Sequence, residues 1–149
     1  MGLKERLKSD LTEAIRARDE VRAGTIRMAL TSITNEEVAG KEARILTDAE
    51  IITVLSREAK KRREAAEAYD SAGSKERGDR ERAEGLVIAD YLPSQLSESE
   101  LQEMIKAAIV ETGVSGPSGM GQVMKILSPK IAGRADGSKV SAAVKAALS

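Results

Sequence analysis

Apolar residues recur every three or four positions along most of the chain, which is the spacing that places them on one face of an α-helix. The first two stretches of this kind begin at Leu3 and Val21 and are separated by a break near Asp19. They predict two helices, the second of which is expected to end at Gly40. No stretch alternates between apolar and polar residues as a half-buried strand does, so the pattern predicts an all-α fold.

A third and longer helix is expected to begin at Thr47-Asp48-Ala49-Glu50, which has the form of a capping box. Its apolar stripe continues to Ala72-Gly73, where the helix should stop. A weaker fourth helix is expected over residues 75–90. These four segments predict an N-terminal helical bundle.

A domain boundary is expected at Tyr91-Leu92-Pro93, because proline disfavours helical geometry in the residue before it. We therefore divide the chain into an N-terminal bundle, residues 1–93, and a small C-terminal domain, residues 94–149. In the second part, Ser97-Glu98-Ser99-Glu100 is another capping box. Three helices are expected after it, one from Leu101 to Gly113 and two short ones near residues 119–128 and 138–148.

The chain contains no histidine and no cysteine. Triads with a catalytic histidine, cysteine nucleophiles, disulfides and histidine- or cysteine-ligated metal sites are therefore excluded. We predict no catalytic residue, no metal site and no cofactor. No segment has the uninterrupted apolar length of a signal peptide or a membrane span, so the expected location is cytoplasmic.

Basic and acidic residues are equal in number, 24 each, but they are unevenly distributed. From Gly116 to the C-terminus there are five basic residues and one acidic residue, a net charge of +4, and the preceding 115 residues carry −4. The C-terminal end is therefore the part of the chain expected to attract an anion.

The segment that joins the last two predicted helices is rich in turn-forming residues. Pro129 is expected to end one helix, Gly133 and Asp136-Gly137 to shape the turn, and Asp136 or Ser138 to cap the next helix. Pro93, Gly121, Gly133, Asp136 and Gly137 are thus the predicted structural residues of this domain.

Four basic residues on this segment, Lys125, Lys130, Arg134 and Lys139, are the candidate contacts to nucleic acid. They lie within fifteen residues of one another, so several of them could follow a phosphate backbone without reading its sequence. On the alternative interpretation they surround a capped turn, with Arg134 held by carbonyl groups or by Asp136.

The glycine-rich segment Gly116-Pro117-Ser118-Gly119-Met120-Gly121 precedes a predicted helix, whose free amides could bind an anion. No predicted strand comes before it, and the spacing fits neither a Rossmann glycine motif nor a P-loop. A structural role is favoured, in which Gly121 allows close contact between helices.

Arg62 falls in the apolar stripe of the third predicted helix, within the charged run Lys60-Lys61-Arg62-Arg63. We expect it to contact a carboxylate of a neighbouring helix and to fix the register of the two helices. An anion site is the alternative. The candidate partners are Glu36, Glu37 and Glu84.

Several segments together resemble the GatB/YqeY family. In the C-terminal half they are Tyr91-Leu92-Pro93-Ser94-Gln95-Leu96-Ser97, Gly119-Met120-Gly121-Gln122-Val123-Met124-Lys125, Pro129-Lys130 and Gly133-Arg134-Ala135-Asp136-Gly137. In the N-terminal half, Thr25-Ile26-Arg27-Met28 and Lys61-Arg62-Arg63 are similar to stand-alone YqeY-like proteins. The resemblance covers essentially the whole chain and implies an N-terminal helical bundle followed by a small three-helix module.

The small module resembles the tail domain of the B subunit of tRNA-dependent amidotransferases, where the tail is implicated in gripping tRNA. The resemblance implies two possible functions: a non-catalytic tRNA- or RNA-associated protein, or an accessory to carbon–nitrogen ligase activity with glutamine as amide donor. A protein-interaction adaptor that uses the apolar grooves between helices is a third possibility, which the balanced net charge favours over RNA binding. The expected partners are tRNA or another structured RNA, or a protein. Nothing in the sequence predicts a membrane partner.

Overall fold

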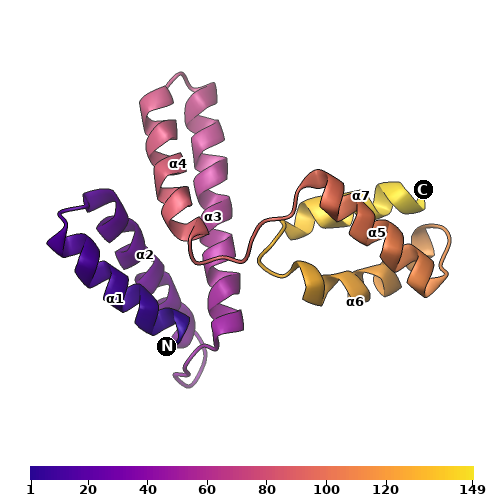
Figure 1. The fold of residues 1–149 in the computed structure, drawn as a ribbon, viewed down its shortest axis with the longest axis horizontal. Helices are drawn as coiled ribbons and strands as arrows, with labels where there is room; N and C mark the ends of the chain where they lie inside the picture. Colours follow the sequence, from indigo (N-terminus) through magenta and orange to yellow (C-terminus); the bar gives the residue numbers. More distant parts are fainter. The chain divides into compact units, whose positions relative to one another are not determined.

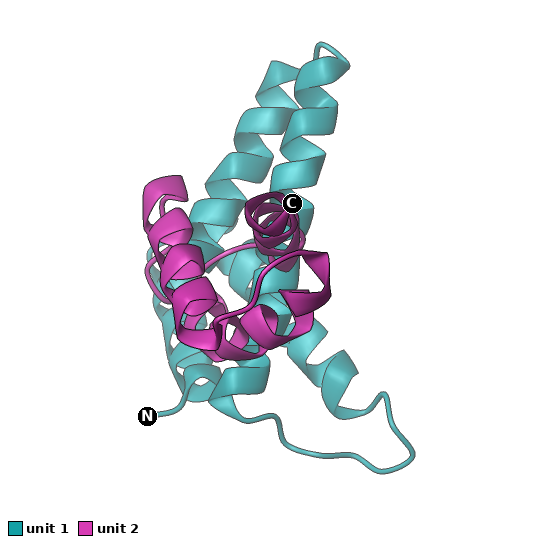
Figure 2. Cartoon of the chain, turned by 90° about the vertical axis from the view of Figure 1, so that its right-hand side faces the viewer, with its two compact units in different colours: residues 1–92 teal, residues 93–149 magenta.

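The computed structural model describes residues 1–149, and every regular element in it is a helix. There are seven α-helices and one short 3-10 helix, so the predicted all-α fold is confirmed. The chain divides into two compact units, residues 1–92 and residues 93–149, which Figure 2 shows in different colours.

The first unit consists of two helical hairpins. Helices α1 (Leu3–Arg16) and α2 (Glu20–Glu37) run side by side, and so do α3 (Asp48–Ser71) and α4 (Lys75–Ala89) (Figure 1). Because α2 also packs against α3 and α4, the two hairpins share one aliphatic core. The most deeply buried side chains of this core are Leu7, Ile26, Ile33, Ile51, Leu55 and Ile88.

Side-chain caps fix where two of these helices begin. Asp19 accepts a hydrogen bond from the backbone amide of Arg22 at 3.1 Å and starts α2. Thr47 accepts from the amide of Glu50 at 3.2 Å and starts α3, as the capping box predicted.

Helix α2 ends at Glu37 and not at Gly40, so the predicted end was three residues too late. The reason is that the following loop folds back onto Glu37. Its carbonyl oxygen accepts from the amide of Arg44 at 2.9 Å, and its carboxylate accepts from the amide of Leu46 at 3.1 Å. The carboxylate of Glu37 also accepts from Lys4, and both contacts lower its pKa.

Tyr91 closes the first unit, just beyond the end of α4. Its ring is buried, its hydroxyl donates to the carboxylate of Asp10 on α1, and the guanidinium of Arg6 lies 4.6 Å from the ring centre. Burial, together with the hydrogen bond to Asp10, raises the pKa of Tyr91 to about 12. The end of α4 is therefore attached to α1 by a neutral phenol.

The second unit contains three helices and a 3-10 turn: α5 (Glu98–Thr112), η1 (Pro117–Gly119), α6 (Met120–Ile131) and α7 (Gly137–Leu148). Ser97 caps α5 by accepting from the amide of Glu100 at 3.1 Å, as predicted. The predicted three-helix module is thus present. Its core is again aliphatic and centres on Ile105, Leu127, Val123, Val140 and Val144.

Two predictions for α6 were wrong. Pro129 does not end the helix, which continues to Ile131 because Ile131 is buried in the core of this unit. Gly121 is exposed, and no neighbouring atom lies close enough to contact a Cβ placed there. The close approach is made by Gly119 instead, where an added Cβ would lie 2.5 Å from the Cβ of Val114.

Candidate nucleic-acid interface

The turn between α6 and α7 is built by glycine geometry and a helix cap. Gly133 has a φ of 74°, in the left-handed region that glycine adopts without steric cost. Asp136 accepts from the amide of Ser138 at 2.9 Å and caps α7, of which Gly137 is already the first residue. Gly133 therefore contributes its backbone conformation to the turn, and Asp136 contributes the cap of α7.

Arg134 holds the segment that follows Pro93 against this turn. Its Nε donates to the carbonyl oxygen of Ser94 at 3.0 Å, and its own carbonyl accepts from the amide of Leu96 at 2.9 Å. The side-chain amide of Gln95 donates to the carbonyl of Gly133 at 2.7 Å. Arg134 is therefore held by a carbonyl group, one of the two partners that the sequence suggested. The terminal nitrogens of its guanidinium make no hydrogen bond to the protein.

The part played by Gln95 was not predicted. Gln95 and Arg134 lie 39 positions apart in the chain, in two of the segments that carry the family resemblance. Nothing in either segment alone shows that the two segments are hydrogen-bonded to each other.

The three candidate lysines Lys125, Lys130 and Lys139 are exposed, and none of them forms an ion pair. They do not form a single cluster. Lys125 and Lys130 both lie on α6, but five residues of α-helix separate their directions by about 140°. Lys139 lies on α7. The lysines therefore place positive charge on more than one side of the second unit.

The basic residues of the first unit are arranged differently, because many of them face carboxylates. Such pairs neutralise charge inside the unit, and each exposed pair adds little to stability. They include Lys4–Glu37, Arg6–Asp10, Arg22–Asp10, Arg57–Glu36 and Arg82–Asp70.

Within residues 93–149, four of the five acidic side chains belong to α5 and the fifth is the helix cap Asp136. The positive charge on α6 and α7 is therefore not compensated along these two helices.

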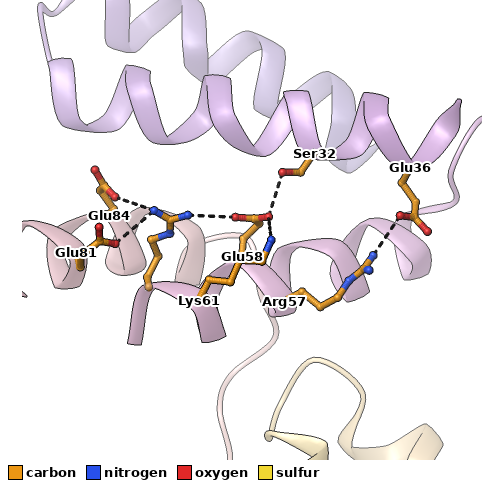
Figure 3. A network of polar contacts seen from close by, with 8 residues as sticks. Ser32, Glu36, Arg57, Glu58, Lys61, Glu81 and Glu84 are labelled. Atoms are coloured by element: carbon orange, nitrogen blue, oxygen red, sulfur yellow. Dashed lines mark hydrogen bonds and ion pairs between the residues drawn. The ribbon is translucent and has the colours of Figure 1, made fainter. Parts of the chain in front are cut away.

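Arg62 lies on α3 among the carboxylates of Glu58, Glu81 and Glu84. Figure 3 labels these three glutamates. Its guanidinium is 3.3 Å from both Glu81 and Glu84 on α4 and 3.4 Å from Glu58 on its own helix. Glu58 is buried and also accepts from Ser32 of α2 at 3.0 Å, so this network connects three helices. Because three carboxylates surround Arg62, the arrangement favours the register-fixing interpretation over an anion site.

Of the predicted partners of Arg62, Glu84 is therefore confirmed, and Glu36 and Glu37 were wrong. Glu36 lies 3.5 Å from Arg57, and Glu37 lies 2.6 Å from Lys4. All three glutamates have apolar neighbours at helical spacing, so the sequence pattern could not choose among them.

No group of three acidic, histidine or cysteine side chains is placed to hold a metal ion. None of the helices has the length and apolar character required to cross a bilayer.

Comparison with known proteins connects both units to one family. A family model described as Yqey-like protein matches residues 4–148. A protein of Pyrenophora tritici-repentis (strain Pt-1C-BFP), named Altered inheritance of mitochondria protein 41, mitochondrial, is 29% identical over 133 residues, which cover 87% of this chain and 71% of that protein. Because the family match extends over nearly the whole chain, the chain belongs to the YqeY family of Yqey-like proteins.

Proposed function

We propose that residues 93–149 form a non-catalytic module that binds the phosphate backbone of tRNA or another structured RNA. The observation that carries the proposal is the uncompensated positive charge of α6 and α7. Lys125, Lys130 and Lys139 are exposed and unpaired, whereas many basic residues of the first unit face carboxylates. Arg134 would add a contact through its terminal nitrogens while its Nε maintains the turn.

The composition of the second unit favours recognition of the backbone over recognition of bases. Specific reading of single-stranded RNA relies on aromatic side chains that stack on bases. The chain has two tyrosines, Tyr69 and Tyr91, and both precede residue 93. We therefore expect affinity to depend on the shape and charge of the RNA and little on its sequence.

Filter binding of folded tRNA at several salt concentrations tests this function. Replacing Lys125, Lys130 or Lys139 by glutamine should weaken binding to all tRNAs tested, because each lysine neutralises a phosphate and releases counterions. Each replacement should also reduce the slope of log affinity against log salt by about 0.7–0.9.

Lys106 provides the matched control. It is an exposed lysine of the same unit, but it lies on α5, the helix that carries four acidic residues. Lys106→Gln should leave both affinity and salt slope unchanged. If wild-type protein shows no salt-dependent binding, or if Lys106→Gln lowers affinity as much as the other three changes, the RNA proposal fails and a protein-interaction adaptor becomes the better explanation.

The family resemblance also suggests a role as an accessory to carbon–nitrogen ligase activity with glutamine as amide donor. We infer that such chemistry would come from partner subunits, because this chain has no histidine or cysteine and no nucleotide-binding loop. The purified chain, incubated with glutamine, ATP and misacylated tRNA, should release no more glutamate, phosphate or amidated product than a blank. Turnover that rises with protein concentration and survives repurification would contradict this inference.

A further inference from the structure

A cavity of about 510 Å³ opens where α1 ends and α2 begins. Its volume lies in the range of about 300–1,000 Å³ that is usual for small-molecule sites. Ala14 of α1 and Ala23 of α2 line it and are almost fully buried, and their small side chains leave the space open. Ile15, which is 51% exposed, also lines the cavity. The cavity therefore offers an apolar surface to a ligand.

Two arginines, Arg18 and Arg27, line the same cavity. Both are exposed and neither has a carboxylate partner. Arg22, on the same helix as Arg27, shows the contrast, since its guanidinium lies 3.7 Å from the carboxylate of Asp10. The two cavity arginines therefore keep free the donors with which guanidinium groups bind carboxylates and phosphates.

Two acidic residues, Asp19 and Glu20, complete the lining. Asp19 is engaged as the cap of α2, where it accepts from the amide of Arg22. Glu20 forms no ion pair and stands in the first turn of α2. Two carboxylates and two arginines make the lining formally neutral, and a neutral lining favours an anion of low charge over a polyanion.

The backbone holds Arg18 in an unusual conformation. Its φ is 55°, in the left-handed region, and it is the sole residue other than glycine with a positive φ. The turn is fixed by hydrogen bonds from the amide of Arg18 to the carbonyl of Ile15 at 3.1 Å and from Asp19 to Ala14 at 2.9 Å. Glycine would adopt this conformation without steric cost, whereas an arginine in it is strained.

We propose that this cavity binds a small organic anion, a carboxylate or phosphate carried on a short apolar group. Arg18 and Arg27 hold the anionic group, and the side chains of Ala14, Ala23 and Ile15 contact the apolar part. The site lies in the first unit and uses none of the lysines assigned to RNA, so its test does not depend on the RNA proposal.

Amide chemical shifts of the full chain, followed by NMR during titration, test the site. The probes are 3-phenylpropionate and phenyl phosphate, with inorganic phosphate as the anion without an apolar part. Both organic anions should shift the amides of residues 14–27 and bind more tightly than inorganic phosphate. Equal binding of inorganic phosphate would overturn the apolar contact, and an absence of shifts in residues 14–27 would overturn the site.

Three variants identify the side chains. Arg18→Gly and Arg27→Gln should each weaken binding by about tenfold, because each removes a charge-assisted hydrogen bond. Arg16→Gln should have no effect, since Arg16 is an exposed and unpaired arginine of α1 that does not line the cavity. Arg18→Gly should melt at or above the wild-type temperature, which separates loss of binding from loss of folding. Unchanged binding by Arg18→Gly and Arg27→Gln, or an equal loss in Arg16→Gln, would refute the proposal.

Discussion

Gly119 and Gly121 stand two positions apart at the start of α6, yet their surroundings give them opposite sensitivity to substitution. Gly119→Ala should lower the free energy of unfolding by about 1–3 kcal/mol, because its Cβ would collide with Val114. Gly121→Ala should leave stability unchanged or raise it by up to about 1 kcal/mol, since the site is open and alanine favours helix. Urea unfolding of both variants measures the difference, and a larger loss in Gly121→Ala would show that the packing around α6 is misassigned.

The same pair shows which residue roles a sequence can reveal. Thr47 and Ser97 were correctly predicted as helix caps because a cap depends on a hydroxyl and an amide only three residues away. The role of a glycine depends on what faces it in three dimensions. The side chain that faces Gly119 is Val114, which is reached through a turn that the hydrophobic pattern does not describe.

At the scale of the elements, the attachment of α4 to α1 through Tyr91 should depend on pH. Tyr91 has a pKa of about 12 in the folded protein and an ordinary value of about 10 when unfolded, so folding favours the neutral phenol. The stabilisation is complete below pH 10 and is lost as the pH rises from about 10 to 12. Lysines also titrate in this range, so the comparison must be made against a variant without this phenol.

Tyr91→Phe supplies that comparison. The variant should be less stable than wild type at pH 8, because Asp10 loses the hydroxyl that donates to it. The difference should shrink by an amount on the order of 2 kcal/mol between pH 9 and 12, since only wild type loses the contribution of a neutral Tyr91. Chemical unfolding at each pH gives both free energies. A difference that stays constant with pH would mean that Tyr91 titrates as it does in the unfolded chain.

Helices were the most predictable elements, and their ends and partners were the least. The recurrence of aliphatic residues every three or four positions in the sequence predicted all seven α-helices. The end of α2 at Glu37 depends on hydrogen bonds from Arg44 and Leu46, and the continuation of α6 beyond Pro129 depends on burial of Ile131. These contacts arise only after the chain has folded, so the local pattern could not contain them.

The candidate sites also differ in whether the sequence alone or only the folded chain reveals them. The charge distribution along the sequence was sufficient to identify Lys125, Lys130 and Lys139 as part of an excess of basic residues, and their contact with RNA stays a prediction. The cavity beside Arg18 and Arg27 was not predicted. Only the pairing of α1 with α2 shows that two alanines leave space there and that both arginines line it.

At the scale of the whole molecule, two non-helical segments differ in how firmly they are held. No backbone hydrogen bond is formed by residues 40–43, and the nearby side chain of Ile45 is 85% exposed. Residues 94–96, by contrast, are bound to the turn before α7 through Arg134 and Gln95. Backbone must be released from such contacts before a protease can accept it, so the two segments should be cut at different rates.

Limited digestion with subtilisin, followed by mass spectrometry of the fragments, tests this difference. Wild-type protein should be cut first within residues 40–46 and more slowly within residues 92–97. Arg134→Ala removes the hydrogen bond to Ser94 and should accelerate only the second cut, because the loop at residues 40–46 belongs to the other unit. Lys130→Ala is the control, since Lys130 is an exposed basic residue near the same turn without a hydrogen bond to that segment. Equal rates for Arg134→Ala and Lys130→Ala at residues 92–97 would show that the Arg134 side chain does not hold the segment. First cuts within α3 would contradict the helical assignment of the longest element.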